Sequence, residues 1–218
     1  NTSFLESQSV GSGKTINVSG LTLGNGTGVA SNYSLSSGTF NVTSRPVTLT
    51  TSRLFDNTKN ADATNLSVTF NNLVGSETLS LSGSGSVTSE NVASGQQSVT
   101  FGTLSLADNT GVASNYTLSS ATLDINAKPI SLSGSKVYDA SATAASSALT
   151  ISGTVSGQTL TLTGNGTLSA GADVGTNKTI NTSGLTLGNG SGGTAGVATN
   201  YSLVGGTYQM TVTQRPVT

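Results

Sequence analysis

The amino-acid sequence predicts an all-β protein built from tandem repeats, and three observations support this. Apolar residues alternate with small polar residues along most of the chain, which is the period of strands with one buried face. Gly, Asn, Asp and Ser interrupt these stretches at the spacing of an antiparallel fold. Finally, residues 10–26 return almost unchanged at 174–190, and a more diverged copy begins midway at Val92. The repetition favours a protein that spans, displays or assembles over one built around a single active site.

The composition predicts an ordered chain with thin cores. Of the 218 residues, 33% are hydrophobic, 8% are charged and 28 are Gly, while the net charge is −1. Disorder usually comes with high net charge and no apolar periodicity, and neither holds here. The charge balance offers no basic face for nucleic acid, and no apolar run is long enough for membrane insertion.

Three prolines mark the expected repeat boundaries. Pro46, Pro129 and Pro216 each follow Arg or Lys, and proline suits a junction or the start of a strand because it lacks a backbone donor. We therefore expect a piece of a longer array. Its predicted parts are the C-terminal part of a repeat (1–44), complete repeats (45–127 and 128–214), and the start of another (215–218).

About six strands and no helix are expected in each complete repeat. In the second repeat the alternating stretches are 47–49, 66–70, 79–81, 99–101, 104–106 and 123–125. In the third repeat they are 130–132, 149–151, 160–162, 185–187 and 208–212. Thr on the outer faces fits strand propensity as well as solubility.

Two landmarks recur besides the prolines. An aromatic residue followed by Asp comes early, as Phe55-Asp56 and Tyr138-Asp139. The motif Asn-Tyr-x-Leu comes late, and its tyrosines are Tyr33, Tyr116 and Tyr201. We expect each Asp to shape a turn by bonding its own backbone, since calcium prefers several clustered carboxylates. We expect each Tyr to pack at the core edge, because it alternates with Leu on one strand face; stacking on sugars is the alternative.

Together with the Val-Gly-x-x-Lys stretch, Gly-Leu-Thr-Leu and the closing Lys/Arg-Pro, these landmarks resemble the YDG-type repeat. The resemblance covers essentially the whole chain and implies a region of a large bacterial surface adhesin, similar to filamentous haemagglutinin and exported by two-partner secretion. It implies an extracellular stalk or matrix protein without catalytic residues. Asn57 and Ala140 stand where the family motif has Gly. Because Ala adopts positive φ reluctantly, we expect the turn to differ in the third repeat.

Asparagines that begin Asn-x-Ser/Thr sequons are candidates for glycosylation, which some adhesins of this type undergo. Chance is an equal explanation in a chain this rich in Asn, Ser and Thr. The candidates are Asn17, Asn25, Asn32, Asn41, Asn65, Asn115, Asn165, Asn177, Asn181, Asn189 and Asn200.

Lys14 and Lys178 recur at one position, and we expect solvated lysines there rather than isopeptide crosslinks, because no recurrent acid accompanies them. Gly-rich stretches such as 24–28 and 188–196 lack the Lys-Ser/Thr of a phosphate-binding loop and are interpreted as hairpin loops.

Reactive residue types are scarce. The chain contains no His, Cys or Trp, so the commonest general base, the thiolate nucleophile and the commonest metal ligand are missing. We expect no enzyme activity, cofactor or metal.

The sequence thus predicts tandem antiparallel β-sandwich-like repeats that form an elongated rod, with β-grasp-like modules or a β-solenoid as alternatives. The predicted function is a non-catalytic stalk or spacer at the bacterial cell surface or in a biofilm matrix. Two alternatives stay open: a filament subunit that docks through strand edges or repeat ends, and a polysaccharide-binding module. The expected partners are neighbouring repeats, identical chains or polysaccharide, and not nucleic acid.

Overall fold

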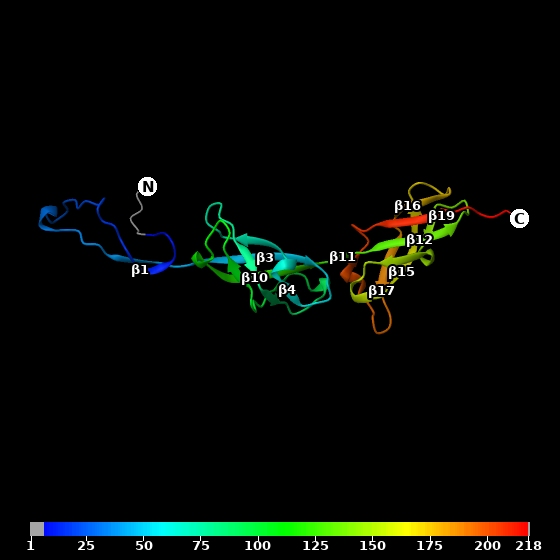
Figure 1. The fold of residues 1–218 in the computed structure, drawn as a ribbon, viewed down its shortest axis with the longest axis horizontal. Helices are drawn as coiled ribbons and strands as arrows, with labels where there is room; N and C mark the ends of the chain where they lie inside the picture. Colours follow the sequence, from blue (N-terminus) through cyan, green and yellow to red (C-terminus); the bar gives the residue numbers. More distant parts are fainter. Residues whose placement is uncertain (1–6, 218) are drawn as a thin grey trace. The chain divides into compact units, whose positions relative to one another are not determined.

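The computed structural model describes residues 7–217. This part of the chain consists of strands, loops and three-residue 3-10 turns and contains no α-helix, which confirms the all-β prediction (Figure 1). No helix in it could cross a membrane.

Residues 7–44 contain one strand pair. Strands β1 (Gly11–Thr15) and β2 (Thr39–Val42) are antiparallel, and their register shifts between Gly11 and Lys14. Gly13 lies in this bulge with φ 64°, a value that glycine adopts without strain. A 3-10 turn, η1 (Ala30–Asn32), ends at the Asn of the Asn-Tyr motif.

Residues 45–127 form eight strands. A four-stranded sheet has the order β5-β3-β10-β8, and β4 pairs with β7 while β6 pairs with β9. The strands are β3 (Arg45–Leu54), β4 (Asn60–Asp62), β5 (Ser67–Asn71), β6 (Ser80–Ser82), β7 (Ser84–Ser86), β8 (Gln97–Ser98), β9 (Ser105–Ala107) and β10 (Tyr116–Asn126). The 3-10 turns are η2 (Ala63–Asn65), η3 (Val92–Ser94) and η4 (Ala113–Asn115).

Residues 128–214 repeat this topology. A seven-stranded sheet has the order β13-β15-β16-β19-β12-β14, with β17 paired to β15, and a separate two-stranded sheet joins β11 to β18. The run β14-β12-β19-β16 corresponds to β5-β3-β10-β8 of the preceding repeat. The strands are β11 (Lys128–Pro129), β12 (Ser131–Val137), β13 (Thr143–Ala145), β14 (Leu149–Ser152), β15 (Leu160–Leu168), β16 (Gly175–Asn181), β17 (Leu185–Asn189), β18 (Tyr201–Ser202) and β19 (Tyr208–Thr213). The 3-10 turns are η5 (Ser146–Ala148), η6 (Val155–Gly157) and η7 (Ala198–Asn200).

The sheets are mixed, so the antiparallel prediction is wrong for some pairs. β12 and β19 are parallel, with Leu132 opposite Tyr208, and β11 and β18 are parallel as well. Strands β12 and β19 lie at the two ends of the repeat, and the intervening chain serves as the long connection that a parallel pair needs. A period of two reveals which face of a strand is buried but not the direction of its neighbour.

The alternation of apolar and polar residues in the sequence correctly predicts which residues form the core. Each complete repeat buries apolar side chains from its strands and from residues next to them, and most of the intervening polar residues are less buried. The buried residues include Val47, Leu49, Leu79, Leu104, Leu123 and Ile125 in the second repeat and Ile130, Leu132, Leu168, Ile180, Met210 and Val212 in the third.

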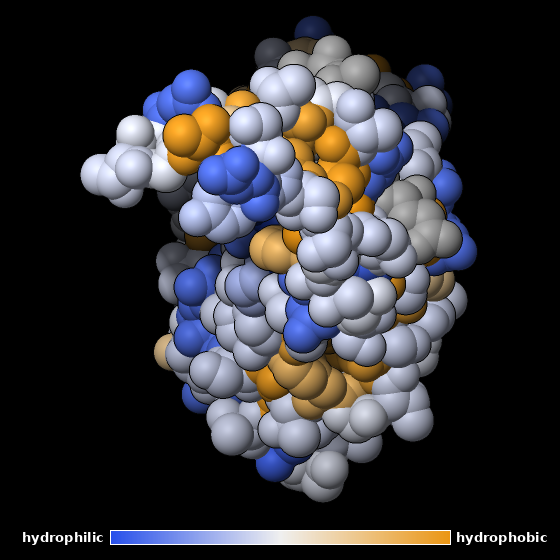
Figure 2. Space-filling view, turned by 90° about the vertical axis from the view of Figure 1, so that its left-hand side faces the viewer, coloured by the Kyte–Doolittle hydropathy of each residue, from blue (hydrophilic) through white to orange (hydrophobic). Residues whose placement is uncertain are grey.

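The described chain falls into two compact units. Among the described residues, one comprises 7–50, 62–85 and 99–121, and the other comprises 51–61, 86–98 and 122–217. The unit boundaries therefore pass through β3 and β10. On the face drawn in Figure 2, near-white side chains of intermediate hydropathy cover most of the surface and orange apolar patches interrupt them.

Candidate functional site

The described residues contain no cluster of three or more side chains of the types that bind metal ions. The recurrent landmarks instead lie at two kinds of place: a turn that follows the first long strand of each complete repeat, and a junction that joins consecutive repeats.

The aromatic–Asp turn is held by the Asp side chain and by a basic residue three positions earlier. Asp56 Oδ1 accepts hydrogen bonds from Thr58 N at 2.9 Å and from the guanidinium of Arg53 at 2.5 Å. Asp139 Oδ1 accepts from Ser141 N at 3.0 Å and from Lys136 Nζ at 2.9 Å. The carboxylates thus shape the local backbone, as the sequence predicts.

The basic residue also binds carbonyl oxygens of the turn. Arg53 donates to Thr58 O at 2.6 Å, and Lys136 donates to Ser141 O and Thr143 O. The Arg53 side chain is only 3% exposed, whereas that of Asp56 is 40% exposed. The hydrogen bond from Lys136 and that from Ser141 N hold the pKa of the Asp139 carboxyl below its ordinary value. The acid therefore stays ionised at neutral pH and keeps both donors.

The turn has the same backbone conformation in both repeats. Asn57 has φ 63° and Ala140 has φ 61°. The expectation that the third repeat turns differently is therefore wrong. Local hydrogen bonds on both sides of Ala140, from Lys136 and to Asp139, accompany a left-handed conformation that its Cβ disfavours.

The hydroxyl groups of Tyr116 and Tyr201 each form hydrogen bonds with a loop of their own repeat. The Tyr116 hydroxyl accepts a hydrogen bond from Val74 N at 3.2 Å and donates to the Glu77 carboxylate. The Tyr201 hydroxyl accepts from Val155 N at 3.1 Å and donates to Gln158 Oε1 at 2.5 Å. The bond to Glu77 and burial together raise the pKa of Tyr116.

The three tyrosines of the motif differ in how far they are buried. Tyr116 and Tyr201 are 7% and 5% exposed, in keeping with core-edge packing, whereas Tyr33 is 68% exposed. The prediction is therefore wrong for Tyr33. The described part of the chain places no loop against this ring that corresponds to the loops carrying Val74 and Val155.

The Asn of the same motif binds the backbone of the preceding repeat. Asn115 Oδ1 accepts a hydrogen bond from Val10 N at 2.9 Å, in the first unit. Asn200 Oδ1 accepts from Val92 N at 3.0 Å, in the second unit. Val10 and Val92 are corresponding residues of the repeat, so one hydrogen bond recurs across each repeat boundary. Asn200 also donates from Nδ2 to Asn91 Oδ1 at 2.8 Å, and it is 2% exposed.

In the second unit the aromatic–Asp turn completes the junction. The ring of Phe55 packs edge-on against Tyr201, with centroids 5.4 Å apart and planes at 77°. Asn57 Oδ1 accepts a hydrogen bond from Gln158 Nε2 at 3.1 Å. Phe55 is 1% exposed, while the corresponding Tyr138 is only half-buried. Residues of the turn thus reach the tyrosine network of the following repeat.

The recurrent lysine is not solvated in the third repeat. Lys178 is 8% exposed, and its Nζ donates to Asp173 O at 2.5 Å, so the predicted solvated lysine is wrong there; Lys14 is half-buried. In the second repeat Gln97 takes this position, 7% exposed, and bonds Ser89 through both its amide oxygen and nitrogen. A bulge beside each lysine turns the side chain back toward a loop.

The remaining sequence landmarks have structural surroundings. Pro46 is the second residue of β3, Pro129 ends β11, and Pro216 follows β19. Of the sequon asparagines, Asn200 is buried and Asn115 is half-buried; the exposed ones are Asn17, Asn25, Asn32, Asn41, Asn65, Asn165, Asn177, Asn181 and Asn189. Asn25 and Asn189 use Oδ1 to accept the backbone N–H of Ala30 and Ala198.

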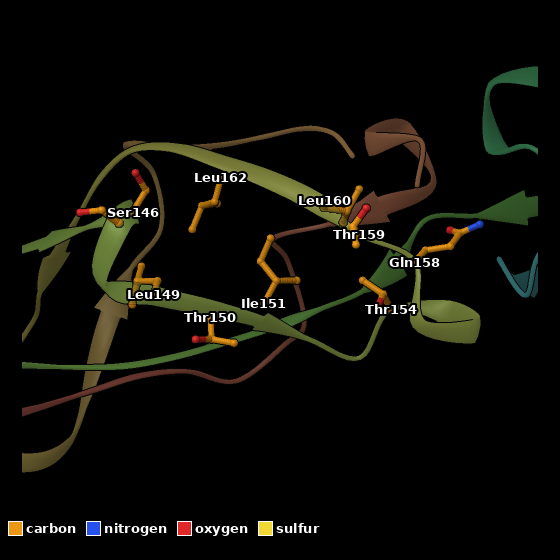
Figure 3. A pocket seen from close by; sticks show the side chains of 10 residues that line it. Ser146, Leu149, Thr150, Ile151, Thr154, Gln158, Thr159, Leu160 and Leu162 are labelled. Carbon is orange, nitrogen blue, oxygen red and sulfur yellow. The ribbon is translucent and has the colours of Figure 1, made fainter. Parts of the chain in front are cut away.

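An open pocket of about 470 Å³ lies between β14 and β15 in the third repeat (Figure 3). Ile151 and Leu162 point toward one another across it, while Thr150 points away. These two strands are separated in the sheet order, so the sheet curls until they face each other. The lining residues are aliphatic, hydroxyl or amide side chains without an aromatic ring or an acid. Nothing in the pocket favours polysaccharide binding over the other predicted functions.

Sequence reasoning missed two features of this site. The basic residues Arg53 and Lys136 recur at the same position before the aromatic residue, and this recurrence was visible in the sequence. The Asn of the Asn-Tyr motif was considered only as a glycosylation candidate. Its partners, Val10 and Val92, lie more than 100 residues away, so no local pattern indicated the bond.

The model of one protein family matches most of the chain. The family is described as the YDG domain, and it matches residues 41–123 and 124–211. No curated protein or solved structure was found to be similar to the chain. Both matched segments contain the turn and the Asn-Tyr motif described above, and together they make up more than half of the sequence. The chain therefore belongs to the YDG domain family.

Proposed function

We propose that this chain is a non-catalytic repeat region that serves as a stalk or spacer in an extracellular bacterial adhesin or biofilm-matrix protein. The observation that carries the proposal is the recurrent junction. In each unit an Asn side chain of one repeat accepts the backbone N–H of a Val in the repeat before it. A junction that uses the same residues at each boundary sets one repeat against the next in a defined way, as a spacer requires.

The surface chemistry supports the same function. Only 8% of the residues are charged and the net charge is −1, while exposed positions are rich in Ser, Thr and Asn. Such a surface limits non-specific electrostatic binding, and this suits a segment that holds an adhesive region away from the cell.

Electron microscopy of the purified chain over a range of concentrations tests the spacer function. A spacer gives separate particles whose length stays constant as concentration rises. Fibres that lengthen with concentration would replace the spacer with the second candidate, a filament subunit. An antibody against the chain, applied to intact and to permeabilised cells, tests the extracellular location.

A further inference from the structure

We propose that each complete repeat bears tensile load, because its first and last long strands form a shear clamp that resists unfolding when the two ends of the repeat are pulled apart. The clamp is the pair β12–β19 in the third repeat and the pair β3–β10 in the second. The proposal depends on how these strands are paired, and it does not depend on the spacer function or on the extracellular location.

The direction of pairing determines how force acts on the clamp. β12 and β19 are parallel neighbours with six consecutive register pairs, from Leu132–Tyr208 to Val137–Thr213 (Figure 1). The start of β12 and the end of β19 therefore lie at opposite ends of the pair. Tension between these two points slides one strand along the other and loads all of their hydrogen bonds together. In an antiparallel pair the two points would lie side by side, and the bonds would break one after another.

The second repeat has the same arrangement. β3 and β10 are hydrogen-bonded neighbours, and the contacts between them advance together along both strands, as in a parallel pair. In chain order these contacts are Ser119 Oγ to Val47 O, Thr51 Oγ1 to Thr122 O, and Phe55 N to Asn126 O. The last of them, at 2.8 Å, recurs in the third repeat as Tyr138 N to Thr213 O at 2.9 Å. Both clamps therefore end on the same backbone hydrogen bond.

Core packing on the clamp strands opposes sliding. Leu132, Met210 and Val212 are each 1% exposed in the third repeat, and Val47 and Leu123 are fully buried in the second. A shift by one residue would move these apolar side chains to the other face of the sheet, so the strands cannot settle into a neighbouring register. The hydrogen bonds and the packing must therefore fail in one step.

The path of the chain carries tension directly through the clamps. The second repeat has chain on both sides, so tension along the protein enters it at β3 and leaves it at β10. β10 ends at Asn126 and β12 begins at Ser131, which leaves four residues between one clamp and the next. While the clamp of the third repeat holds, residues 138–207 lie between its two strands in sequence and carry no tension.

The test measures the unfolding force of the full chain in two pulling directions by single-molecule force spectroscopy. The chain contains no Cys, so introduced pairs of Cys define the attachment points. Lys128→Cys with Gln214→Cys pulls β12 and β19 in shear. Val137→Cys with Gln214→Cys is the matched control, because these two positions lie at the same end of the pair and the strands are then peeled apart. Denaturant unfolding checks that both pairs of substitutions leave the fold intact.

We expect the shear direction to need at least about twice the force of the peeling direction at the same loading rate, because forced unfolding follows the unfolding rate and all the bonds of the clamp set that barrier together. Each shear event should release on the order of 300 Å of chain, the extended length of the repeat. Equal forces in the two directions, or a lower force in shear, would overturn the proposal.

Two core variants separate the clamp from general stability. Met210→Ala removes packing inside the clamp, whereas Leu168→Ala removes a similarly buried side chain from β15; the two residues are 1% and 2% exposed. Both should lower the denaturant midpoint, but only Met210→Ala should lower the shear force. Val212→Ala is a milder change in the same strand, for use if Met210→Ala does not fold. Equal losses of shear force in the clamp variant and in Leu168→Ala would overturn the proposal.

Discussion

Replacing Asn200 with Ala tests whether the Asn of the Asn-Tyr motif is a junction residue. Asn200 is 2% exposed, and its side chain accepts the Val92 N–H at 3.0 Å and donates to Asn91 Oδ1 at 2.8 Å. The substitution leaves a partly buried backbone donor without its acceptor, which costs about 1 to 3 kcal/mol. We expect the free energy of unfolding to fall by about 2 kcal/mol. For a chain of this size that lowers the melting temperature by about 4 to 8 °C.

Two matched variants give the expected order of effects. Asn115 makes the same bond to Val10 N but is half-buried, so Asn115→Ala should cost about 1 kcal/mol. Asn32 has the same place in the motif but is exposed, so Asn32→Ala should change stability by less than about 0.5 kcal/mol. Denaturant unfolding of the three variants and the parent chain gives these values.

A double-mutant cycle separates the junction from the local turn. Asn91→Ala and Asn200→Ala remove the two ends of one bond between repeats, and their effects should couple by about 0.5 to 1.5 kcal/mol. Calorimetry should also show the third repeat melting more independently in Asn200→Ala, since the interface term between repeats is weakened. Equal losses from Asn32→Ala and Asn200→Ala, with no coupling to Asn91, would refute the junction role.

Three other predictions concern the turn and the core. Ala140→Gly should stabilise the chain by up to about 1 kcal/mol in denaturant unfolding, because Ala140 has φ 61°; a loss of stability would contradict the left-handed turn. The bond from Lys136 lowers the pKa of Asp139, so this carboxylate stabilises the fold above its ordinary pKa of 3.8 and loses that effect as pH falls through the lowered pKa. Asp139→Asn should therefore flatten the acid side of the stability profile, and an unchanged profile would count against this ion pair. Leu79 is 5% exposed, so Leu79→Asp should destabilise the second repeat by more than about 3 kcal/mol; an unaltered melting curve would contradict its core position.

The sequence predicted which faces of the strands are buried and did not predict how the strands are joined. Leu123 and Ile125 alternate with polar residues, and both are buried as their period implies. The parallel pairing of β12 with β19 depends on a connection of about 70 residues, and no periodicity within either strand contains that information. The Asp turns, in contrast, were predictable: the hydrogen bond that Thr58 N donates to Asp56 Oδ1 spans two residues, so local chemistry determines it.

The hydrogen bonds of the junction could not be predicted from local sequence patterns. Asn115 and Asn200 act on residues more than 100 positions away, and an Asn before Tyr has several ordinary roles. The same limit explains Lys178. The sequence predicts a solvent-exposed lysine at this position. In the structure a bulge at Asn177, with φ 51°, directs the Lys178 side chain to the carbonyl oxygen of Asp173.

The identical residues 20–26 and 184–190 show what determines strand formation in this chain. One copy is a strand and the other is not, so intrinsic propensity cannot be the deciding term; the difference is whether a neighbouring strand supplies backbone partners and covers Leu21 or Leu185. Because only 33% of the residues are hydrophobic, each half-repeat can bury little apolar surface by itself. Each half is therefore stabilised mainly by the half that pairs with it.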